Sequence, residues 1–354
     1  MIPLLFTSNQ PFSGKSSFCV GIGSILKDIG LKVGYMKPMG TLSVKVGDII
    51  TDEDAHYISK IFGMKNDMAD ISPVILSEDS YRNFLKDNKF SGNFLEKISK
   101  AFNNIKQDKD VVLLEGAKSI EDGLSLGIAS RNICNKIKAK TIVIFKYLPE
   151  IIDQVLFYKE YFKNNFGGII INLVPEESTG YVKDFILPYL SNKKINVFGC
   201  VTSDKVLSSL SIKEMARHLD GKILSAKDKL DELVETFMLG AMGQEQALKF
   251  FRMKTNKAVI TGGDRADIQL AALETNTRCL ILTGNFQPSS VVLGRAEEIG
   301  VPIILVKYDT LTTVEKLNVI IGHAGFHEFK KIDKIIQMTK EFIDIEGLIK
   351  LTKN

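Results

Sequence analysis

The stretch LLFTSNQPFSGKSS, residues 4–17, joins a short apolar run to a segment with helical periodicity. A loop between a strand and a helix N-terminus gathers free backbone N–H groups around an anion, so this position is typical of a phosphate-binding loop. In such a loop the Lys15 ammonium reaches the β- and γ-phosphates of a nucleotide, and the Ser16 hydroxyl ligates Mg²⁺. Asn9 stands where the motif GxxxxGK[ST] has its first glycine, so the strict spacing is not met. The alternative is an ordinary turn with a capping serine, but the position favours an ATP and Mg²⁺ site made of Ser13, Gly14, Lys15, Ser16 and Ser17.

Outward from this loop, short apolar runs alternate with longer segments of helical pattern. Strands are expected at residues 4–7, 32–36, 111–114, 141–145, 168–173 and 197–201, with helices at 15–29, 94–105 and 149–162. The runs are almost continuously hydrophobic, which is typical of a parallel sheet covered on both faces. The sequence therefore predicts a doubly wound α/β domain.

The same α/β alternation restarts after a polar turn and a short helix near residues 212–218. Further strands are expected at residues 258–261, 279–283 and 302–306. A chain of 354 residues is too long for one ordinary core. We therefore predict a P-loop domain at 1–220, a smaller α/β domain at 225–322 and a helical tail at 323–354.

Composition argues for a soluble protein with large cores and against two classes of partner. The chain is 45% hydrophobic and 25% charged, with a net charge of only +4. Neither a nucleic acid nor a membrane surface is indicated by that charge, and no apolar run approaches the ~18 residues that span a bilayer. The apolar N-terminus has no basic leader, so a cytoplasmic location is expected. The cysteines are expected to be reduced core residues, since no pair has metal-ligand spacing: Cys19, Cys134, Cys200 and Cys279.

Acidic residues close to the predicted strand ends are candidate ligands for Mg²⁺. Glu115 follows the run 111–114, and the carboxyl end of a parallel strand is where ligands bind. Asp54 is a second candidate, whereas Asp52 and Glu53 are expected to cap the helix at 56–62. Lys37 ends the second strand and could stabilise a phosphate or carboxylate, although a solvated lysine fits the pattern too.

The order of several motifs resembles that of a known enzyme family. The motifs are Ser13-Gly14-Lys15-Ser16, Gly34-Tyr35-Met36-Lys37-Pro38, Asp54-Ala55, Glu115-Gly116-Ala117 and Gly168-Ile169-Ile170-Ile171-Asn172. This part of the chain resembles dethiobiotin synthetase, and it is more similar still to the synthetase-like N-terminal domain of long phosphotransacetylases. The resemblance implies that Lys37 faces the acceptor and Asn172 lies near the adenine, while Mg-ATP is bound by Lys15, Ser16, Asp54 and Glu115. Residues 118–121, KSIE, depart from the glycine-rich continuation of the synthetase.

A second resemblance covers about residues 225–317. The sequence ITGGDRAD at residues 260–267, with Thr283-Gly284 and Asp309-Thr310 further along, resembles the DRTGG domain of long phosphotransacetylases. Asn285 replaces a glycine of that pattern. The three strand ends could converge on one edge of a sheet.

The DRTGG-like turn has a structural and a functional interpretation. Gly262-Gly263 is expected to form a positive-φ turn, and Asp264 to cap a helix that begins near Arg265. Such a turn alone explains the glycines. A pocket for an effector such as an adenine nucleotide, or for a partner subunit, would be lined by Thr261, Gly262, Gly263, Asp264, Arg265, Thr283 and Gly284.

Two functional hypotheses follow. The first is an ATP-binding regulatory or accessory protein, expected to be a homo-oligomer such as a dimer, linked to phosphotransacetylase metabolism of acetyl-CoA and acetyl phosphate. The ~30 residues after Gly322 are too few for an acetyltransferase domain, so that activity is not expected in this chain. The second is a stand-alone ATP-dependent ligase that activates a carboxylate or carbamate, as dethiobiotin synthetase and the cobyrinate amidases do. The sequence leaves open whether ATP is hydrolysed or only sensed.

Overall fold

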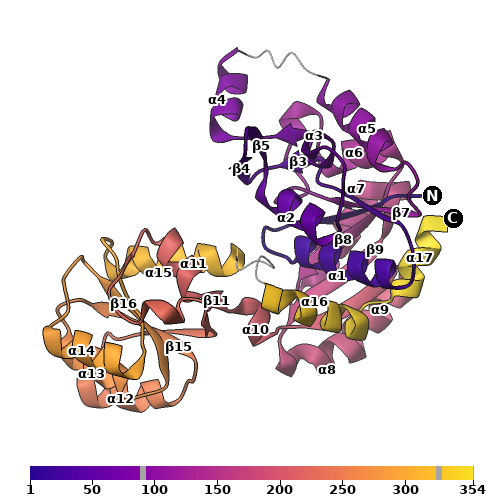
Figure 1. Cartoon of the computed structure of the whole chain (residues 1–354). Helices are drawn as coiled ribbons and strands as arrows, with labels where there is room; N and C mark the ends of the chain where they lie inside the picture. The colour runs from indigo at the N-terminus through magenta and orange to yellow at the C-terminus, as the bar shows by residue number, and fades with distance from the viewer. Residues whose placement is uncertain (88–92, 324–328, 354) are drawn as a thin grey trace. The chain divides into compact units, whose positions relative to one another are not determined.

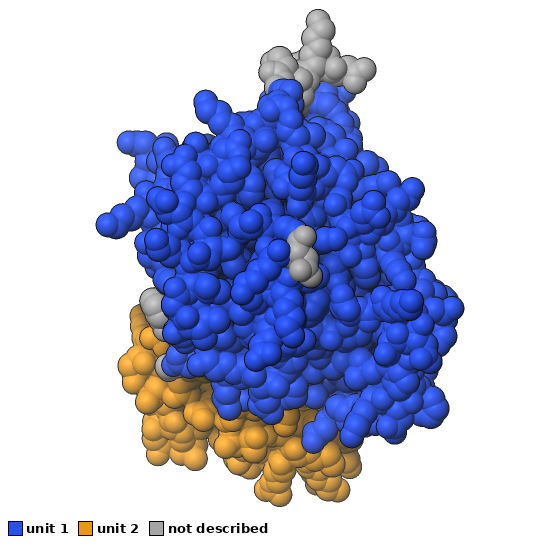
Figure 2. All heavy atoms as spheres, turned by 90° about the vertical axis from the view of Figure 1, so that its right-hand side faces the viewer, with its two compact units in different colours: residues 1–203, 326–354 blue, residues 204–325 orange. Residues whose placement is uncertain are grey.

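The computed structural model describes residues 1–87, 93–323 and 329–353, and the chain divides into two compact units (Figure 1). Unit 1 consists of residues 1–203 and 326–354, and unit 2 of residues 204–325 (Figure 2). Within the described ranges, no helix combines the length and the apolar character needed to cross a membrane.

Unit 1 is built on a six-stranded sheet in which all neighbouring strands run parallel. In spatial order the strands are β10 (Val197–Thr202), β9 (Phe166–Val174), β8 (Lys140–Lys146), β1 (Leu4–Ser8), β7 (Val111–Glu115) and β2 (Val33–Met36). All six apolar runs of the sequence form these strands, because a strand buried on both faces can be apolar at successive positions. The doubly wound α/β fold is confirmed.

Helices follow or precede these strands as the periodicity predicted. They are α1 (Lys15–Asp28), α3 (Met68–Ile71), α4 (Glu78–Asp87), α5 (Phe94–Ile105), α6 (Ser130–Ile137), α7 (Ile151–Phe162), α8 (Thr179–Tyr181) and α9 (Leu187–Asn192). The helices predicted at 15–29, 94–105 and 149–162 correspond to α1, α5 and α7.

Small strands between β2 and α4 were not predicted. They are β3 (Met39–Gly40), which pairs with β6 (Val74–Ile75), and an antiparallel hairpin of β4 (Ser43–Val46) and β5 (Ile49–Asp52). The helix α2 (Glu53–Ile61) begins earlier than expected, because the Asp52 carboxylate accepts a hydrogen bond from the Ala55 N–H and caps it. The hairpin thus delivers Asp52 and Asp54 to a helix N-terminus.

The C-terminal helices belong to unit 1 and are not a separate tail. Helix α16 (Phe329–Phe342) packs against α1 and β10, and α17 (Ile345–Lys353) packs against β10 (Figure 1). Backbone bonds fix this return: the Ile2 N–H donates to the Thr352 carbonyl, and the Asp344 N–H donates to Phe198. A parallel sheet needs helical cover on both faces, and these helices supply part of it with the buried side chains of Ile335, Met338 and Leu348.

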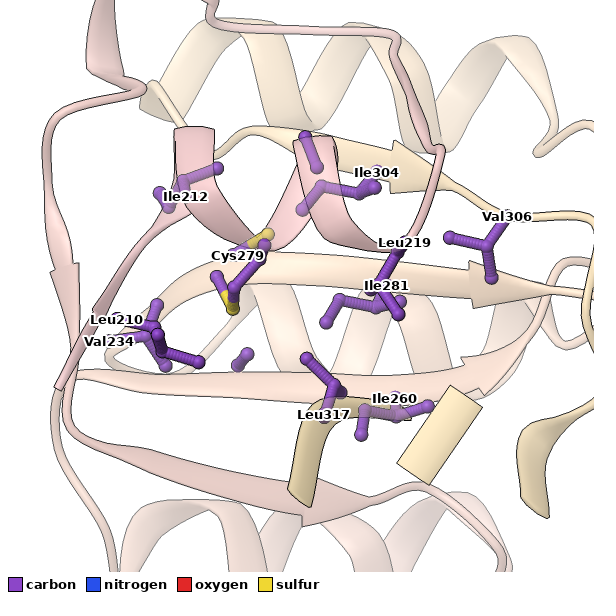
Figure 3. Packing of buried hydrophobic residues seen from close by; sticks show 13 residues of the cluster. Leu210, Ile212, Leu219, Val234, Ile260, Cys279, Ile281, Ile304, Val306 and Leu317 are labelled. Atoms are coloured by element: carbon purple, nitrogen blue, oxygen red, sulfur yellow. The ribbon is translucent and has the colours of Figure 1, made fainter. Parts of the chain in front are cut away.

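The unit boundary also differs from the expected one at residues 220–225. Helix α11 (Ile212–His218) lies in unit 2, where Leu210, Met215 and Leu219 join its core (Figure 3). Because these apolar residues need cover from the unit 2 sheet, the chain changes unit after Ser203.

The core of unit 2 lies on both faces of a five-stranded sheet. Its strands are β12 (Lys222–Ile223), β17 (Ile303–Leu305), β16 (Thr277–Thr283), β15 (Lys257–Gly262) and β14 (Thr236–Leu239), with only β12 antiparallel to its neighbour. Successive side chains point to opposite faces, so Ile260 and Ile281 lie in one cluster (Figure 3), whereas Val259 and Leu280 lie in the other. The restarted α/β pattern is confirmed.

The remaining elements of unit 2 surround this sheet. They are α10 (Lys205–Ser208), β11 (Leu210–Ser211), β13 (Leu233–Val234), α12 (Gln244–Arg252), α13 (Ala266–Leu273), α14 (Ser290–Ile299) and α15 (Thr310–His323). The short strands β11 and β13 pair with each other in antiparallel fashion.

Because α16 packs closely against α1, we expect a glycine-to-alanine change in α1 to destabilise the protein, although such a change normally stabilises a helix. A Cβ at Gly21 in α1 would lie 2.1 Å from Thr339 Oγ1 and 3.2 Å from Ile335 Cγ2. We expect Gly21→Ala to destabilise the protein by about 1–3 kcal/mol through overpacking. Gly294→Ala in α14 is the control, since nothing lies within 4 Å of its Cβ; it should gain about 0.5–1 kcal/mol from helix propensity. Chemical denaturation measures both, and equal effects would contradict the docking.

Candidate functional site

The loop between β1 and α1 has the geometry of an anion cradle. Gly14 is the N-terminal cap of α1 and has φ 95°, a left-handed conformation that glycine adopts without strain. A Cβ at this position would lie 2.6 Å from Asn172 Nδ2. Conformation and space therefore both require glycine, and Lys15 and Ser16 occupy the first turn of α1 as the sequence predicted.

Asn172 fixes the loop from a neighbouring part of the sheet. It lies near the end of β9 and is 9% exposed, and its Nδ2 donates a 2.9 Å hydrogen bond to the Ser13 carbonyl. The structure thus brings Asn172 to the phosphate loop. A position near an adenine ring remains a prediction.

The Lys15 ammonium is folded back onto protein oxygens. Its Nζ donates to Ser8 Oγ at 2.6 Å and to the Lys118 carbonyl at 2.9 Å. Burial lowers the pKa of Lys15 to about 8, and the nearby Glu115 opposes that decrease. A phosphate would offer the ammonium a charged acceptor in place of these neutral ones.

Glu115 is the last residue of β7, as the sequence predicted, and it connects this strand to the loop helix α1. Its Oε1 accepts a 2.7 Å hydrogen bond from Ser16 Oγ, and its Oε2 accepts one of 2.9 Å from the Tyr35 hydroxyl. β7 lies between β1 and β2, so its carboxyl end faces both partners. Burial raises the pKa of Glu115, although the Lys37 ammonium counteracts this.

Lys37 lies at the centre of three carboxylates. Its Nζ is 2.7 Å from Asp54 Oδ2, 2.8 Å from Asp52 Oδ1 and 3.3 Å from Glu115 Oε1. Burial disfavours its charge, but Glu115, Asp54 and Asp52 outweigh that effect and raise the pKa of Lys37 well above its usual value. At 4% exposure the side chain is not the solvated surface lysine that the sequence allowed.

The sequence assigned Asp52 only a structural role as a helix cap, whereas the structure makes it part of the site. It caps α2 as expected, but it also pairs with Lys37 and accepts from the Thr41 and Leu42 N–H groups at 3.0 Å each. The carboxylate is fully buried. Asp52 and Asp54 are two residues apart, and this spacing was a signal that they share a partner. The sequence does not show, however, that the end of β5 and the first turn of α2 bring both carboxylates to Lys37.

The side chains that converge here fit a magnesium ion chemically. Ser16, Asp54 and Glu115 present hydroxyl and carboxylate oxygens, the ligand type that Mg²⁺ prefers. Asp54 and Glu115 already share one cation, the Lys37 ammonium, and Ser16 contacts Glu115. Among the residues that the structure describes, no cluster of three or more His, Cys, Asp or Glu is arranged to hold a metal by itself.

In unit 2 the strand-end turns meet at one edge of the sheet. Thr283 Oγ1 lies 3.0 Å from Thr310 Oγ1, and the Gly263 N–H donates to the Thr283 carbonyl at 3.2 Å. Thr261 is the penultimate residue of β15, next to these turns, and its hydroxyl donates to the Gly240 carbonyl. The expected convergence of the turns is therefore present.

Two expectations about the DRTGG-like turn were wrong. Gly262 and Gly263 do not have positive φ; the left-handed residues are Gly284 (φ 78°) and Asn285 (φ 59°), and asparagine tolerates that conformation. Gly263 is required by space, since a Cβ there would lie 1.9 Å from the Phe286 carbonyl oxygen. Asp264 does not cap α13, whose cap position is Arg265 with no side-chain cap bond.

The charge of Arg265 has a nearby partner. Its Nε and one terminal nitrogen both donate to the Asp267 carboxylate at 3.0 Å, and the latter nitrogen also reaches the Met242 carbonyl at 3.1 Å. This bidentate pair raises the pKa of Arg265 and lowers the pKa of Asp267. A cation at a helix N-terminus is unfavourable, and the pair with Asp267 explains why Arg265 is tolerated there.

Comparison with known families assigns a domain to each of the two units. A family model described as an AAA domain matches residues 4–211, well over half of the chain. The chain belongs to this AAA-domain family. A second model, the DRTGG domain, matches residues 214–320. The suspected fusion of a dethiobiotin-synthetase-like P-loop domain with a DRTGG domain is confirmed.

Curated relatives of this AAA-domain chain include phosphate acetyltransferases and dethiobiotin synthetases. A phosphate acetyltransferase from Pseudomonas aeruginosa is 22% identical over 364 residues, covering 95% of this chain and 50% of that protein. An ATP-dependent dethiobiotin synthetase from Methanococcus vannielii is 25% identical over 203 residues, covering 56% of this chain and 89% of that protein. The chain spans about half the length of the phosphate acetyltransferases that it matches. Among solved structures, the cell division protein MinD from Aquifex aeolicus has 18% identity and a TM-score of 0.36, covering 58% of this chain and 84% of that one.

The role of Asn172 in holding the phosphate loop can be tested by measuring the stability of the protein. Asn172→Ala leaves the Ser13 carbonyl without its buried donor, so we expect a loss of about 1–3 kcal/mol in the free energy of unfolding. Asn196 is a matched control, since its amide donates to the Gly167 carbonyl at 3.0 Å from an exposed position. Asn196→Ala should lose less, because water can replace the bond. Urea titrations with equal losses would argue against a special role for Asn172.

Proposed function

We propose that unit 1 binds ATP together with Mg²⁺, and that the chain acts as a regulatory or accessory protein in phosphotransacetylase-linked metabolism of acetyl-CoA and acetyl phosphate. The observation that carries the nucleotide proposal is the contact between Ser16 on the loop helix and Glu115 on β7, with Lys15 beside them. This places a hydroxyl, a carboxylate and an ammonium around one helix N-terminus, the set that a magnesium–triphosphate complex requires.

Each proposed binding residue has a distinct role. Ser13, Gly14 and Ser17 supply loop backbone around the phosphates, and Lys15 neutralises the β- and γ-phosphates. Ser16, Asp54 and Glu115 would hold Mg²⁺, which supplies charge neutralisation and orientation of the phosphates when bound. Asn172 keeps the loop in place and lies near the adenine in this proposal.

Two considerations support the regulatory interpretation. The similarity to phosphate acetyltransferases extends across both domains, over 95% of the chain in one relative. A nucleotide site and a second domain with converging turns are the two distinct sites that allosteric coupling needs. We propose the cytoplasm as the location, where ATP and acetyl phosphate are both available.

A ligase is the second candidate, and Lys37 favours it. Its buried ammonium lies beside the proposed Mg²⁺ ligands, where it could face the carboxylate or carbamate of an acceptor. The match to dethiobiotin synthetase covers 89% of that enzyme. The two candidates differ in turnover, because a ligase releases phosphate only when a second small substrate is present, whereas a sensor binds ATP with little or no hydrolysis.

For unit 2 we propose an effector or subunit contact at the edge formed by the three turns. Thr261, Thr283 and Gly284 lie there with the glycines and with Asp264 and Arg265, as part of the DRTGG domain. An adenine nucleotide is the proposed effector, and a second copy of the chain in a homodimer is the proposed partner.

The nucleotide proposal predicts that Lys15→Ala abolishes measurable ATP binding, because the triphosphate loses its buried counter-charge. Lys257 is a matched control: its buried ammonium donates to the Lys254 and Asn276 carbonyls, and burial lowers its pKa to about 8 as well. Calorimetry should find unchanged ATP affinity in Lys257→Ala. Wild-type affinity in a folded Lys15→Ala protein would refute the P-loop assignment.

The proposal for unit 2 is tested with Arg265→Ala in the Lys15→Ala background, where the P-loop is silent. If the turn edge binds an effector or a second subunit, the change should remove the remaining AMP or ATP effect on melting temperature, or alter the mass measured by light scattering. Arg295→Ala is the control, since Arg295 pairs with Glu298 on the surface of the same unit. If Arg265→Ala and Arg295→Ala differ in neither readout, the DRTGG domain has only a structural role.

A further inference from the structure

The centre of the site in unit 1 is already filled by a cation of the protein itself. The Lys37 ammonium is 2.7 Å from Asp54, 2.8 Å from Asp52 and 3.3 Å from Glu115. These carboxylates come from different elements: β5 ends at Asp52, α2 contains Asp54 and β7 ends at Glu115. Convergence of two segments that are distant in the sequence, the β5–α2 junction and the end of β7, on one ammonium is the arrangement expected around a bound cation.

The charges of this cluster do not cancel. Three carboxylates meet one ammonium, and all four side chains are buried or nearly so. Asp52 receives three backbone N–H bonds, and Glu115 receives the hydroxyls of Ser16 and Tyr35. Hydrogen bonds thus stabilise the excess negative charge without neutralising it, so a second positive charge is attracted to the cluster.

A divalent cation and Lys37 compete for the same oxygens. Asp54 and Glu115 are proposed Mg²⁺ ligands, yet both are within salt-bridge distance of the ammonium. Two positive charges a few ångströms apart repel strongly in a site with little water. Binding of Mg²⁺ at Asp54 and Glu115 therefore requires Lys37 to move away from them.

We propose that Lys37 is an internal counterion that excludes divalent cations until the nucleotide is present. The triphosphate brings the negative charge that can accept the displaced ammonium, and Asp52, which is not a proposed Mg²⁺ ligand, retains it at the site. Cation binding is then coupled to nucleotide binding, and each increases the affinity of the other. This inference rests on the proposed Mg-ATP site and adds the order in which the site is filled.

The test measures Mn²⁺ binding to the full chain without nucleotide, by the loss of the free-ion electron paramagnetic resonance signal. We expect Lys37→Gln to bind one Mn²⁺ at least about tenfold more tightly than the wild type, because one competing positive charge is removed. Lys37→Arg keeps the charge and should behave as the wild type. Lys257→Gln removes a buried lysine that donates to two backbone carbonyls in unit 2 and should change nothing.

A second readout covers the case in which Lys37→Gln is unstable. Loss of the ammonium leaves buried carboxylates unpaired, so Mn²⁺ should raise the melting temperature of Lys37→Gln or Lys37→Met more than that of the wild type. A wild-type protein that binds Mn²⁺ tightly without ATP, or neutral variants that show no gain in either readout, would overturn the inference. Failure of the wild type to bind Mn-ATP would instead overturn the proposed function, so the two failures are distinguishable.

Discussion

The buried carboxylate of Glu115 is the interaction on which the site in unit 1 depends. It is 1% exposed, and the hydroxyls of Ser16 and Tyr35 together with the Lys37 ammonium surround it. Ser16 lies in α1, whereas Tyr35 lies in β2 and Lys37 directly after it. One carboxylate at the end of β7 therefore links the phosphate loop to the two neighbouring strands β7 and β2. A buried charge is tolerated only when it is paired and hydrogen-bonded, and this requirement fixes the relative positions of all of these groups.

The packing of α1 extends this constraint to the other end of the chain. Helix α1 carries Lys15 and Ser16 at its first turn, and Gly21 further along gives α16 room to approach. Helix α16 is therefore part of the layer that positions the loop helix. An insertion of unit 2 between β10 and α16 leaves the sheet of unit 1 intact, because a return segment from far along the sequence can cover it as well as a local one.

The DRTGG domain shows how a motif can combine structural and functional requirements. Gly263 is explained by the close approach of the Phe286 backbone, and Arg265 by its pair with Asp267. At the same edge of the sheet, Thr283 at the end of β16 contacts Thr310 at the start of α15. The ends of parallel strands are where α/β domains bind ligands, and this edge is consequently the region of unit 2 to which we assign function.

The sequence alone determined the six strands of the unit 1 sheet, the strands β15, β16 and β17 of unit 2, the loop at Gly14-Lys15-Ser16 and the acid that ends β7. Those features are local: continuous apolar runs define buried parallel strands, and a glycine before a helix defines an anion cradle. Only the tertiary structure decided that Asp52 shares Lys37 with Asp54, that Asn172 holds Ser13, and that residues 329–353 return to unit 1. Each of these depends on contacts between segments distant along the chain. Periodicity indicates which residues are buried, but it does not indicate which segment of the chain packs against them.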